Sequence, residues 1–171
     1  MCTLSVTEAK IRNLIAGDWE RVSSIYLDGI ATGQATFETR APSWDLWHSG
    51  HLPAPRLVAT NAAHIVGWAA LSAASLRSVY AGVAEVSVYV SSDWRGRGVG
   101  KRLLQRLAAD SEKNLIWTLQ ASIFPENVAS MALHKSCGFR EVGRRERIGK
   151  LNGGWRDTLL LERRSKLVGI D

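Results

Sequence analysis

The chain has 171 residues, 46% hydrophobic and 22% charged, which is typical of one globular domain with ample material for a core. It has no apolar run long enough to span a membrane and its first residues lack signal-peptide features, so we expect a cytoplasmic protein without a membrane partner. The net charge of +6 suits a polyanionic partner. With only Cys2 and Cys137, neither a disulfide framework nor a metal site is expected.

Apolar periodicity and turn residues divide the chain into strands and helices. The predicted elements, in chain order, are a strand at 9–15, a helix at 19–30 with Asp18 as its N-cap, a loop at 32–39, a short helix after Ser43, a hairpin of strands at 56–60 and 64–71, a strand at 84–90, a helix from 101, a strand at 116–124, a helix from 127 closed by Gly138, and strands at 141–148 and 155–162. In the strand at 84–90, Ala84 and the three valines share one face, and Glu85, Ser87 and Tyr89 share the other.

Three glycines alternate at 96–100, between the strand at 84–90 and the following helix. Without Cβ atoms the backbone can approach a ligand closely, and a helix N-terminus adds unpaired N–H groups and a positive dipole end. The loop therefore predicts an anion site that suits a pyrophosphate. A Walker loop is excluded because Arg95 and Arg102 stand where it needs Gly and Ser or Thr, and the G-x-G-x-G spacing misses the dinucleotide fingerprint.

Residues 95–100 match the (Gln/Arg)-x-x-Gly-x-(Gly/Ala) loop of the GCN5-related N-acetyltransferases. The likeness extends to 85–90, to Asn127-x-x-Ser130-x-x-Leu133-His134-x-x-Cys137-Gly138-Phe139 and to Trp155-Arg156-Asp157, and this set resembles the phosphinothricin and methionine sulfoximine N-acetyltransferase branch. Residues 79–85 and 144–147 look like the arsinothricin-resistance enzymes. The resemblance implies one α/β (α+β) domain over residues 1–171, with a core at about 9–164 and a mixed, mostly antiparallel sheet of about six or seven strands flanked by about four helices.

By this resemblance, the chain transfers acetyl from acetyl-CoA to the α-amine of phosphinothricin, arsinothricin or methionine sulfoximine, by direct transfer in a ternary complex and without a metal, and so confers resistance. Relatives are commonly homodimers, so a homodimer is expected. The implied cofactor-binding residues are Val88, Tyr89, Val90, Arg95, Gly96, Arg97, Gly98, Val99, Gly100, Lys101, Asn127, Ser130 and Ser136. The backbone of 88–90 would hold the pantetheine arm, and the glycine loop the pyrophosphate. Asn127 would bind the pantetheine amides, and as the N-cap of its helix it also has a purely structural role available.

Glu85 is the candidate base. An amino-acid ammonium lies roughly four to five pKa units above an ordinary glutamate, so a water relay is favoured over direct proton abstraction. The structural alternative is a Glu that pairs with a nearby Arg. His134 lies at the family position of a second catalytic group, but a packed or capping His fits equally well. Cys137 is expected to be a buried, inert thiol rather than an acetyl carrier.

The residues expected to bind the acceptor are Phe37, Glu38, Ser75, Arg77, Tyr80, Glu85, Val86 and Ser87. Many relatives carry two arginines in the loop before the Glu85 strand, whereas this chain has Ser75 at the first position and keeps Arg77. Arg77 either pairs with a substrate carboxylate or phosphinate or is simply solvated. Two alternatives stay open: acetylation of another small amine or a protein N-terminus, and a basic nucleic-acid-binding module, which is less favoured because no nucleic-acid motif is present.

Overall fold

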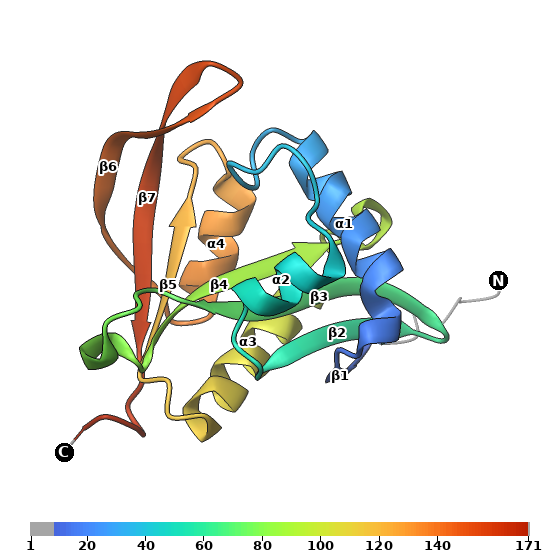
Figure 1. The fold of residues 1–171 in the computed structure, drawn as a ribbon, viewed down its shortest axis with the longest axis horizontal. Coiled ribbons are helices and arrows are strands. Elements are labelled where there is room, and N and C mark those ends of the chain that lie inside the picture. Colours follow the sequence, from blue (N-terminus) through green and yellow to red (C-terminus); the bar gives the residue numbers. More distant parts are fainter. Residues whose placement is uncertain (1–8, 171) are drawn as a thin grey trace, which may run out of the picture.

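The computed structural model describes residues 9–170, so Cys2 lies outside the described part of the chain. The helices and strands follow the predicted order. They are β1 (Lys10–Asn13), α1 (Trp19–Ala31), α2 (Trp44–Gly50), β2 (Arg56–Asn61), β3 (His64–Ala73), β4 (Val83–Val90), α3 (Val99–Lys113), β5 (Thr118–Ile123), α4 (Val128–Ser136), β6 (Arg140–Leu151) and β7 (Gly154–Arg164) (Figure 1). Short 3-10 turns occupy Ala16–Asp18, Ser78–Tyr80 and Ser92–Trp94.

The predicted helix caps are confirmed in part. Ser43 accepts a hydrogen bond from the N–H of Leu46 and so caps α2. Asp18 precedes α1 as predicted, but its side chain does not cap the helix. Its carboxylate instead accepts two hydrogen bonds from the Arg12 guanidinium, at 2.7 and 2.8 Å, and one from the N–H of Ile15. A charge-assisted bidentate pair with Arg12 is stronger than a capping bond, which explains the difference.

The strands form a seven-stranded sheet in the order β1-β2-β3-β4-β5-β7-β6. Neighbouring strands are antiparallel except for β4 and β5, which are parallel, so the predicted mixed and mostly antiparallel sheet is confirmed. β4 and β5 pair only from Val83 to Glu85, opposite residues 118–120. Beyond that point the two strands diverge, as their arrowheads in Figure 1 show.

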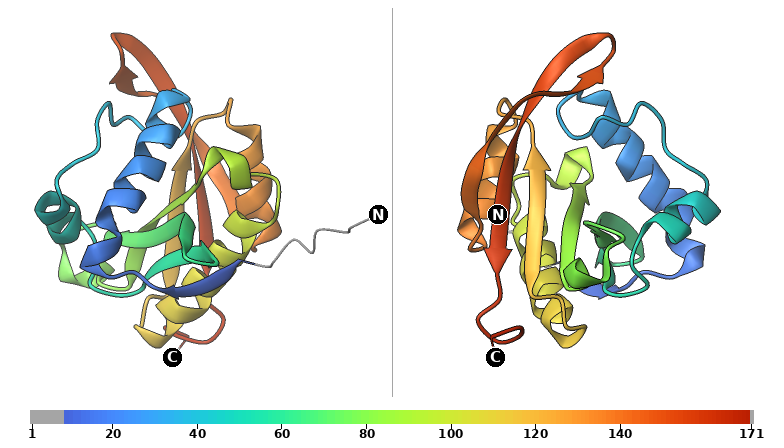
Figure 2. Two further views of the ribbon diagram at one scale, coloured as in Figure 1. Left: turned by 90° about the vertical axis from the view of Figure 1, so that its right-hand side faces the viewer. Right: turned by 60° about the vertical axis from the view of Figure 1, so that its left-hand side comes forward.

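Helices cover both faces of the sheet (Figure 2). α1 and α2 pack on one face, where Trp47 and Trp68 are fully buried beside Val22 and Ile25. α3 and α4 pack on the other, over a core that includes Leu103, Leu104, Leu107, Leu119 and Leu161. β4 separates its side chains as predicted: Tyr89 stacks on Trp68 with ring centroids 4.8 Å apart, whereas the valines join the α3 side.

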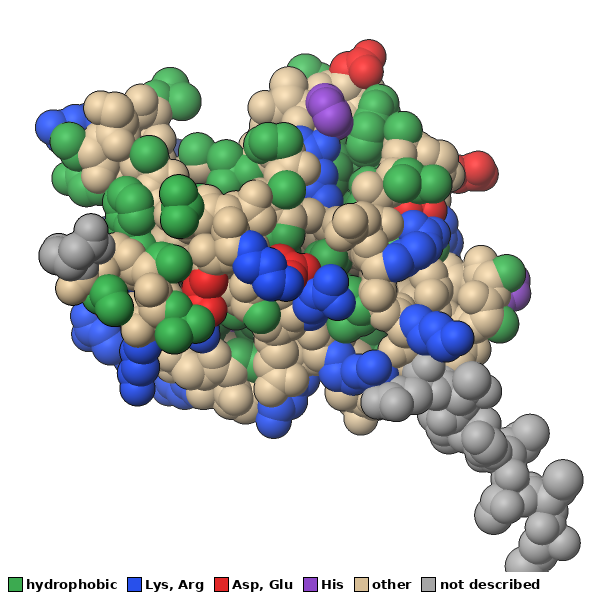
Figure 3. All heavy atoms as spheres, turned by 90° about the horizontal axis from the view of Figure 1, so that it is seen from below, with side chains coloured by type: hydrophobic (Ala, Val, Ile, Leu, Met, Phe, Trp, Pro, Cys, Tyr) green, Lys and Arg blue, Asp and Glu red, His purple; other side chains and the backbone are tan. Residues whose placement is uncertain are grey.

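Basic side chains lie in several separate groups on the surface seen from below (Figure 3). No helix within residues 9–170 combines the length and the apolar character needed to cross a membrane. Cys137 is a free thiol of intermediate exposure, with its Sγ 3.9 Å from the backbone oxygen of Lys101. It is therefore less buried than predicted.

Gly82 fixes the point at which β4 and β5 begin to pair. Its carbonyl oxygen accepts hydrogen bonds from the N–H groups of Trp117 and Thr118, at 2.8 and 3.0 Å. A Cβ at Gly82 would lie 2.0–2.3 Å from three atoms of the Trp117 ring. The backbone of this corner can approach the indole only because residue 82 has no side chain.

We predict that Gly82→Ala lowers the free energy of unfolding by about 1–3 kcal/mol, because the Trp117 ring must move out of a packed corner. Urea denaturation measures the change. Gly17→Ala is the control, since a Cβ there meets nothing within 4 Å, and it should stay within about 0.5 kcal/mol of the parent. Equal stability of the two variants would contradict the role given to this corner.

Candidate active site

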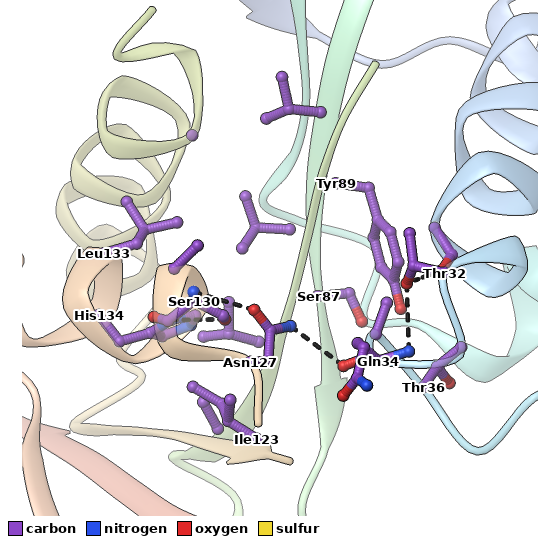
Figure 4. Close-up of a pocket in the computed structure, with 18 of the residues that line it drawn as sticks. Thr32, Gln34, Thr36, Ser87, Tyr89, Ile123, Asn127, Ser130, Leu133 and His134 are labelled. Carbon is purple, nitrogen blue, oxygen red and sulfur yellow. Dashed lines mark hydrogen bonds between the residues drawn. The ribbon is translucent and has the colours of Figure 1, made fainter. Parts of the chain in front are cut away.

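A cavity of about 810 Å³ opens where β4 and β5 diverge. Its walls come from the C-terminal half of α1, the following loop, the outer halves of β4 and β5, the glycine loop, and the first turns of α3 and α4. Figure 4 shows α4 on one side of the cavity and the loop after α1 on the other, with β4 between them. A volume of this size accommodates a ligand larger than a single amino acid.

The glycine loop forms one end of the cavity. Gly96 and Gly98 have φ values of +73° and +79°, in the left-handed region that favours glycine, and a Cβ on either would meet no protein atom within 4 Å. Gly98 is the N-cap of α3, so the unpaired N–H groups of the helix start beside it. The Arg95 Nε donates to the carbonyl of Val90 at 3.1 Å and fastens the loop to the end of β4.

Most of the predicted cofactor residues line this cavity. They are Val88, Tyr89, Val90, Arg95, Gly96, Gly98, Val99, Gly100, Lys101, Asn127 and Ser130. Arg97 and Ser136 are absent from the lining. The Arg97 guanidinium instead lies 4.9 Å from the ring centroid of Trp94, and the Ser136 hydroxyl donates to the carbonyl of Leu133.

Glu85 lies on the cavity wall, at the residue where β4 and β5 stop pairing. Its Oε2 accepts a hydrogen bond of 3.4 Å from the Nε2 of Gln120, its partner on β5. Within residues 9–170 no Lys or Arg forms an ion pair with Glu85, which removes the alternative of a Glu held by an Arg. Val86 and Ser87 also line the cavity, on opposite faces of β4.

Asn127, the N-cap of α4, and His134 within the helix line the cavity on the side opposite the loop after α1. Asn127 caps α4 by accepting from the N–H of Ser130 at 3.1 Å, as predicted, and its Nδ2 donates to the carbonyl of Gln34 at 3.0 Å, so that it bridges the two walls (Figure 4). His134 is 3% exposed, and its Nδ1 lies 2.8 Å from the carbonyl of Ser130. Burial lowers the pKa of His134, so the ring is neutral at pH 7, with Nδ1–H as the donor and Nε2 as an acceptor.

The predicted acceptor residues divide into two groups. Phe37 and Glu38 line the cavity, and the Phe37 ring packs edge to face on Phe124 with centroids 4.9 Å apart. Ser75, Arg77 and Tyr80 do not line it. They lie in the exposed loop before β4, where Arg77 stacks over the Tyr80 ring, whereas the cavity lies beyond Glu85 at the other end of the strand.

Several lining residues were missed by the sequence analysis. They include Tyr26, Gln34, Thr36, Trp94, Ser122, Phe124 and Thr158. Gln34 and Thr36 belong to the loop already predicted at 32–39. Ser122 and Phe124 alternate with Gln120 on the predicted strand, so they share the face of Glu85, a signal that becomes informative once β5 is paired with β4. Within residues 9–170, no group of three or more His, Cys, Asp or Glu side chains gathers as a metal site would require.

The sequence pattern of the acetyltransferase (GNAT) family matches residues 18–139. A phosphinothricin N-acetyltransferase of Alcaligenes faecalis is 34% identical over 85% of this chain and 77% of its own length. An L-methionine sulfoximine/L-methionine sulfone acetyltransferase of Pseudomonas aeruginosa is 31% identical over 90% and 93% of the two chains.

Solved structures agree with this match. A GNAT superfamily phosphinothricin acetyltransferase from Sinorhizobium meliloti, crystallised with AcCoA, superposes with a TM-score of 0.86 at 29% identity, covering 96% of this chain and 92% of its own. The overall fold is therefore shared along nearly the whole chain. The chain belongs to the GNAT acetyltransferase family and is an acetyl-transferring enzyme.

Proposed function

We propose that this protein is an acetyl-CoA-dependent N-acetyltransferase that acts on the α-amine of a small glutamate-like toxin, namely phosphinothricin, arsinothricin or methionine sulfoximine, and so serves as a cytoplasmic resistance enzyme. One observation carries the proposal: a single cavity contains both the glycine loop and the Glu85 carboxylate, which has no ion-pair partner within residues 9–170, at the end of the β4–β5 pairing. The names of the two curated relatives support phosphinothricin and methionine sulfoximine as acceptors, and arsinothricin is included for its likeness to them.

The cofactor would lie along β4. The pyrophosphate would sit against residues 96–101, where left-handed glycines and the N-terminus of α3 present N–H groups to an anion. The pantetheine arm would run beside Val88–Val90, past the end of the pairing with β5, like an added strand. Asn127 would exchange its bond to Gln34 for the pantetheine amides.

The reaction would proceed by direct transfer. A water held by Glu85 removes a proton from the substrate ammonium, and the amine nitrogen then attacks the thioester carbonyl. The carbonyl oxygen takes the negative charge, which backbone N–H groups of β4 stabilise. Attack forms the C–N bond, and collapse of the tetrahedral intermediate breaks the C–S bond and releases CoA thiolate, which takes up the second proton that the nitrogen loses as it becomes an amide. His134 is the second candidate for proton handling, through the acceptor Nε2 that its bond to Ser130 leaves available.

Thiol release from acetyl-CoA tests the proposal directly. The acceptors are phosphinothricin, arsinothricin, methionine sulfoximine, ordinary amino acids, a polyamine and a peptide with a free N-terminus. Turnover confined to the glutamate analogues is the expected result. Turnover with the polyamine or peptide alone would reassign the acceptor, and CoA-independent, salt-sensitive binding to nucleic acid without any turnover would favour the basic binding module.

A homodimer is also part of the proposal. Val142, Ile148 and Trp155 are exposed apolar side chains on the β6–β7 hairpin, and Leu76 and Val79 are exposed in the loop before β4. Exposed apolar groups of this kind suit a contact with a second copy. Light scattering at micromolar concentration should give the mass of two chains. The mass of one chain would refute the proposed homodimer.

The role of Glu85 gives a first mutational prediction. Glu85→Gln keeps the size and the hydrogen bond to Gln120 but cannot take up a proton, so kcat should fall about 100-fold or more while the Kd for acetyl-CoA is unchanged. The acidic limb of the pH–rate profile should flatten. Glu20→Gln, on the exposed start of α1, is the control and should behave as the parent. Parental turnover by Glu85→Gln would remove Glu85 from the mechanism.

The glycine loop gives a second prediction, with a matched control. Gly98→Ala places a methyl group on the ligand side of the loop, so the Kd for CoA measured by calorimetry should rise at least about tenfold. Gly153→Ala has nearly the same φ, +82°, and also meets no protein atom within 4 Å, but it lies in the β6–β7 turn. It carries the same backbone strain and should bind CoA normally. Equal CoA affinities in the two variants would overturn the cradle assignment.

A further inference from the structure

One buried hydroxyl on the cavity wall has no hydrogen-bond partner. Thr158 is 3% exposed and lines the cavity, and its Oγ1 finds no partner within residues 9–170. A buried hydroxyl without a partner is costly, so its retention here needs a reason. Its register partner on β6 is Arg145, whose buried Nε also lacks a partner in the described chain.

Arg145 differs from other arginines of the same two strands. Arg140, Arg144 and Arg156 each form an ion pair with a carboxylate, from Glu162, Asp157 and Glu126 respectively. For Arg145, no carboxylate of residues 9–170 lies within ion-pair distance. Its guanidinium donates instead to the Ser122 hydroxyl at 2.6 Å, and Ser122 lines the cavity. A half-buried cation therefore sits behind two cavity hydroxyls without a countercharge.

The strand registers place these groups on the same face as Glu85. Glu85 pairs with Gln120, so Ser122 shares that face two residues further along β5. Ser122 pairs with Leu160 on β7, which puts Thr158 on the same face, and Thr158 pairs with Arg145. Ser122 lies about 7 Å beyond Gln120 along the strand, a separation on the scale of a glutamate-like side chain.

A bulge in β6 fixes the position of Arg145. The register shifts between Arg145 and Gly149, and Arg147 within the bulge has a φ of +46°. The Asp157 carboxylate holds this geometry by accepting from the backbone N–H of Arg147 at 2.7 Å and from the Nε of Arg144 at 2.8 Å. Bulges commonly re-aim side chains next to binding sites.

We propose that Arg145, with the hydroxyls of Ser122 and Thr158, binds the distal acidic group of the acceptor while Glu85 handles its amine. This assignment rests on the proposed function and names the residues that select a negatively charged side chain. Arg145 does not itself line the cavity but donates to Ser122, which does, whereas Arg77 stacks on Tyr80 in the loop before β4. The chemistry suits a phosphinate or a similar tetrahedral oxyanion, which accepts several hydrogen bonds at once.

Steady-state kinetics on two acceptors tests the assignment: phosphinothricin, whose distal group is anionic, and methionine sulfone, whose distal group is neutral. Arg145→Met should raise KM for phosphinothricin at least about tenfold and leave KM for acetyl-CoA unchanged, with a smaller effect on methionine sulfone. Arg145→Lys should recover part of the loss. Arg140→Met, which removes an exposed arginine of the same strand, should leave both values at the parental level.

Thr158→Val separates binding from folding, because it removes the unpartnered hydroxyl at constant shape. Its melting temperature should equal or exceed that of the parent, whereas KM for phosphinothricin should rise about threefold or more. If the parent acetylates the acceptors but Arg145→Met and Thr158→Val leave the ratio of the two KM values unchanged, the assignment is overturned and the proposed function stands. If the parent acetylates neither acceptor, both the assignment of Arg145 and the proposed function are overturned.

Discussion

The early end of the β4–β5 pairing is the constraint on which the rest of this structure depends. Two parallel neighbours pair over residues 83–85 and then separate, although both strands continue. The backbone polar groups of β4 past Glu85 need other partners on that side, and an extended ligand with amide groups can supply them. The glycine loop follows β4 after one short 3-10 turn, so the strand half that has separated from β5, the loop and the helix start line one side of the cavity.

The wall formed by the loop after α1 is held in place by contacts with distant parts of the chain. Arg156 of β7 donates to the carbonyl of Gly33 at 3.2 Å, and its guanidinium lies 4.1 Å from the centroid of Phe124. Asn127 of α4 reaches the carbonyl of Gln34 in the same loop. The loop after α1 is thus held against β7 and α4 before an acceptor binds. Binding therefore costs less conformational entropy than it would with a mobile loop.

Local patterns were enough to predict most of the fold and most of the residues that line the glycine-loop end of the cavity. The order of elements, the two faces of β4 and the capping role of Asn127 all depend on residues close in sequence, where periodicity and capping preferences act directly. The glycine loop was found for the same reason, since Gly96 and Gly98 adopt the left-handed conformation that makes glycine necessary.

The acceptor end could not be predicted in this way. Ser122, Thr158 and Arg145 meet only because β7 lies between β5 and β6 in the sheet and because β6 bulges after Arg145. Neither the order of the strands in the sheet nor the bulge in β6 can be read from the spacing of residues that are close in sequence. Arg77 was placed at the acceptor by resemblance, but the position of its loop relative to the cavity depends on where the two central strands separate.

The central claim is that the diverging half of β4 is the surface along which the cofactor lies. Hydrogen–deuterium exchange with and without CoA measures this most directly, because amides that gain a hydrogen-bond partner exchange more slowly. The account predicts slower exchange in residues 86–90 and 96–101, with the paired strands β1 and β2 and the β6–β7 turn unchanged. Unchanged exchange in β4, with protection elsewhere in the chain, would contradict it.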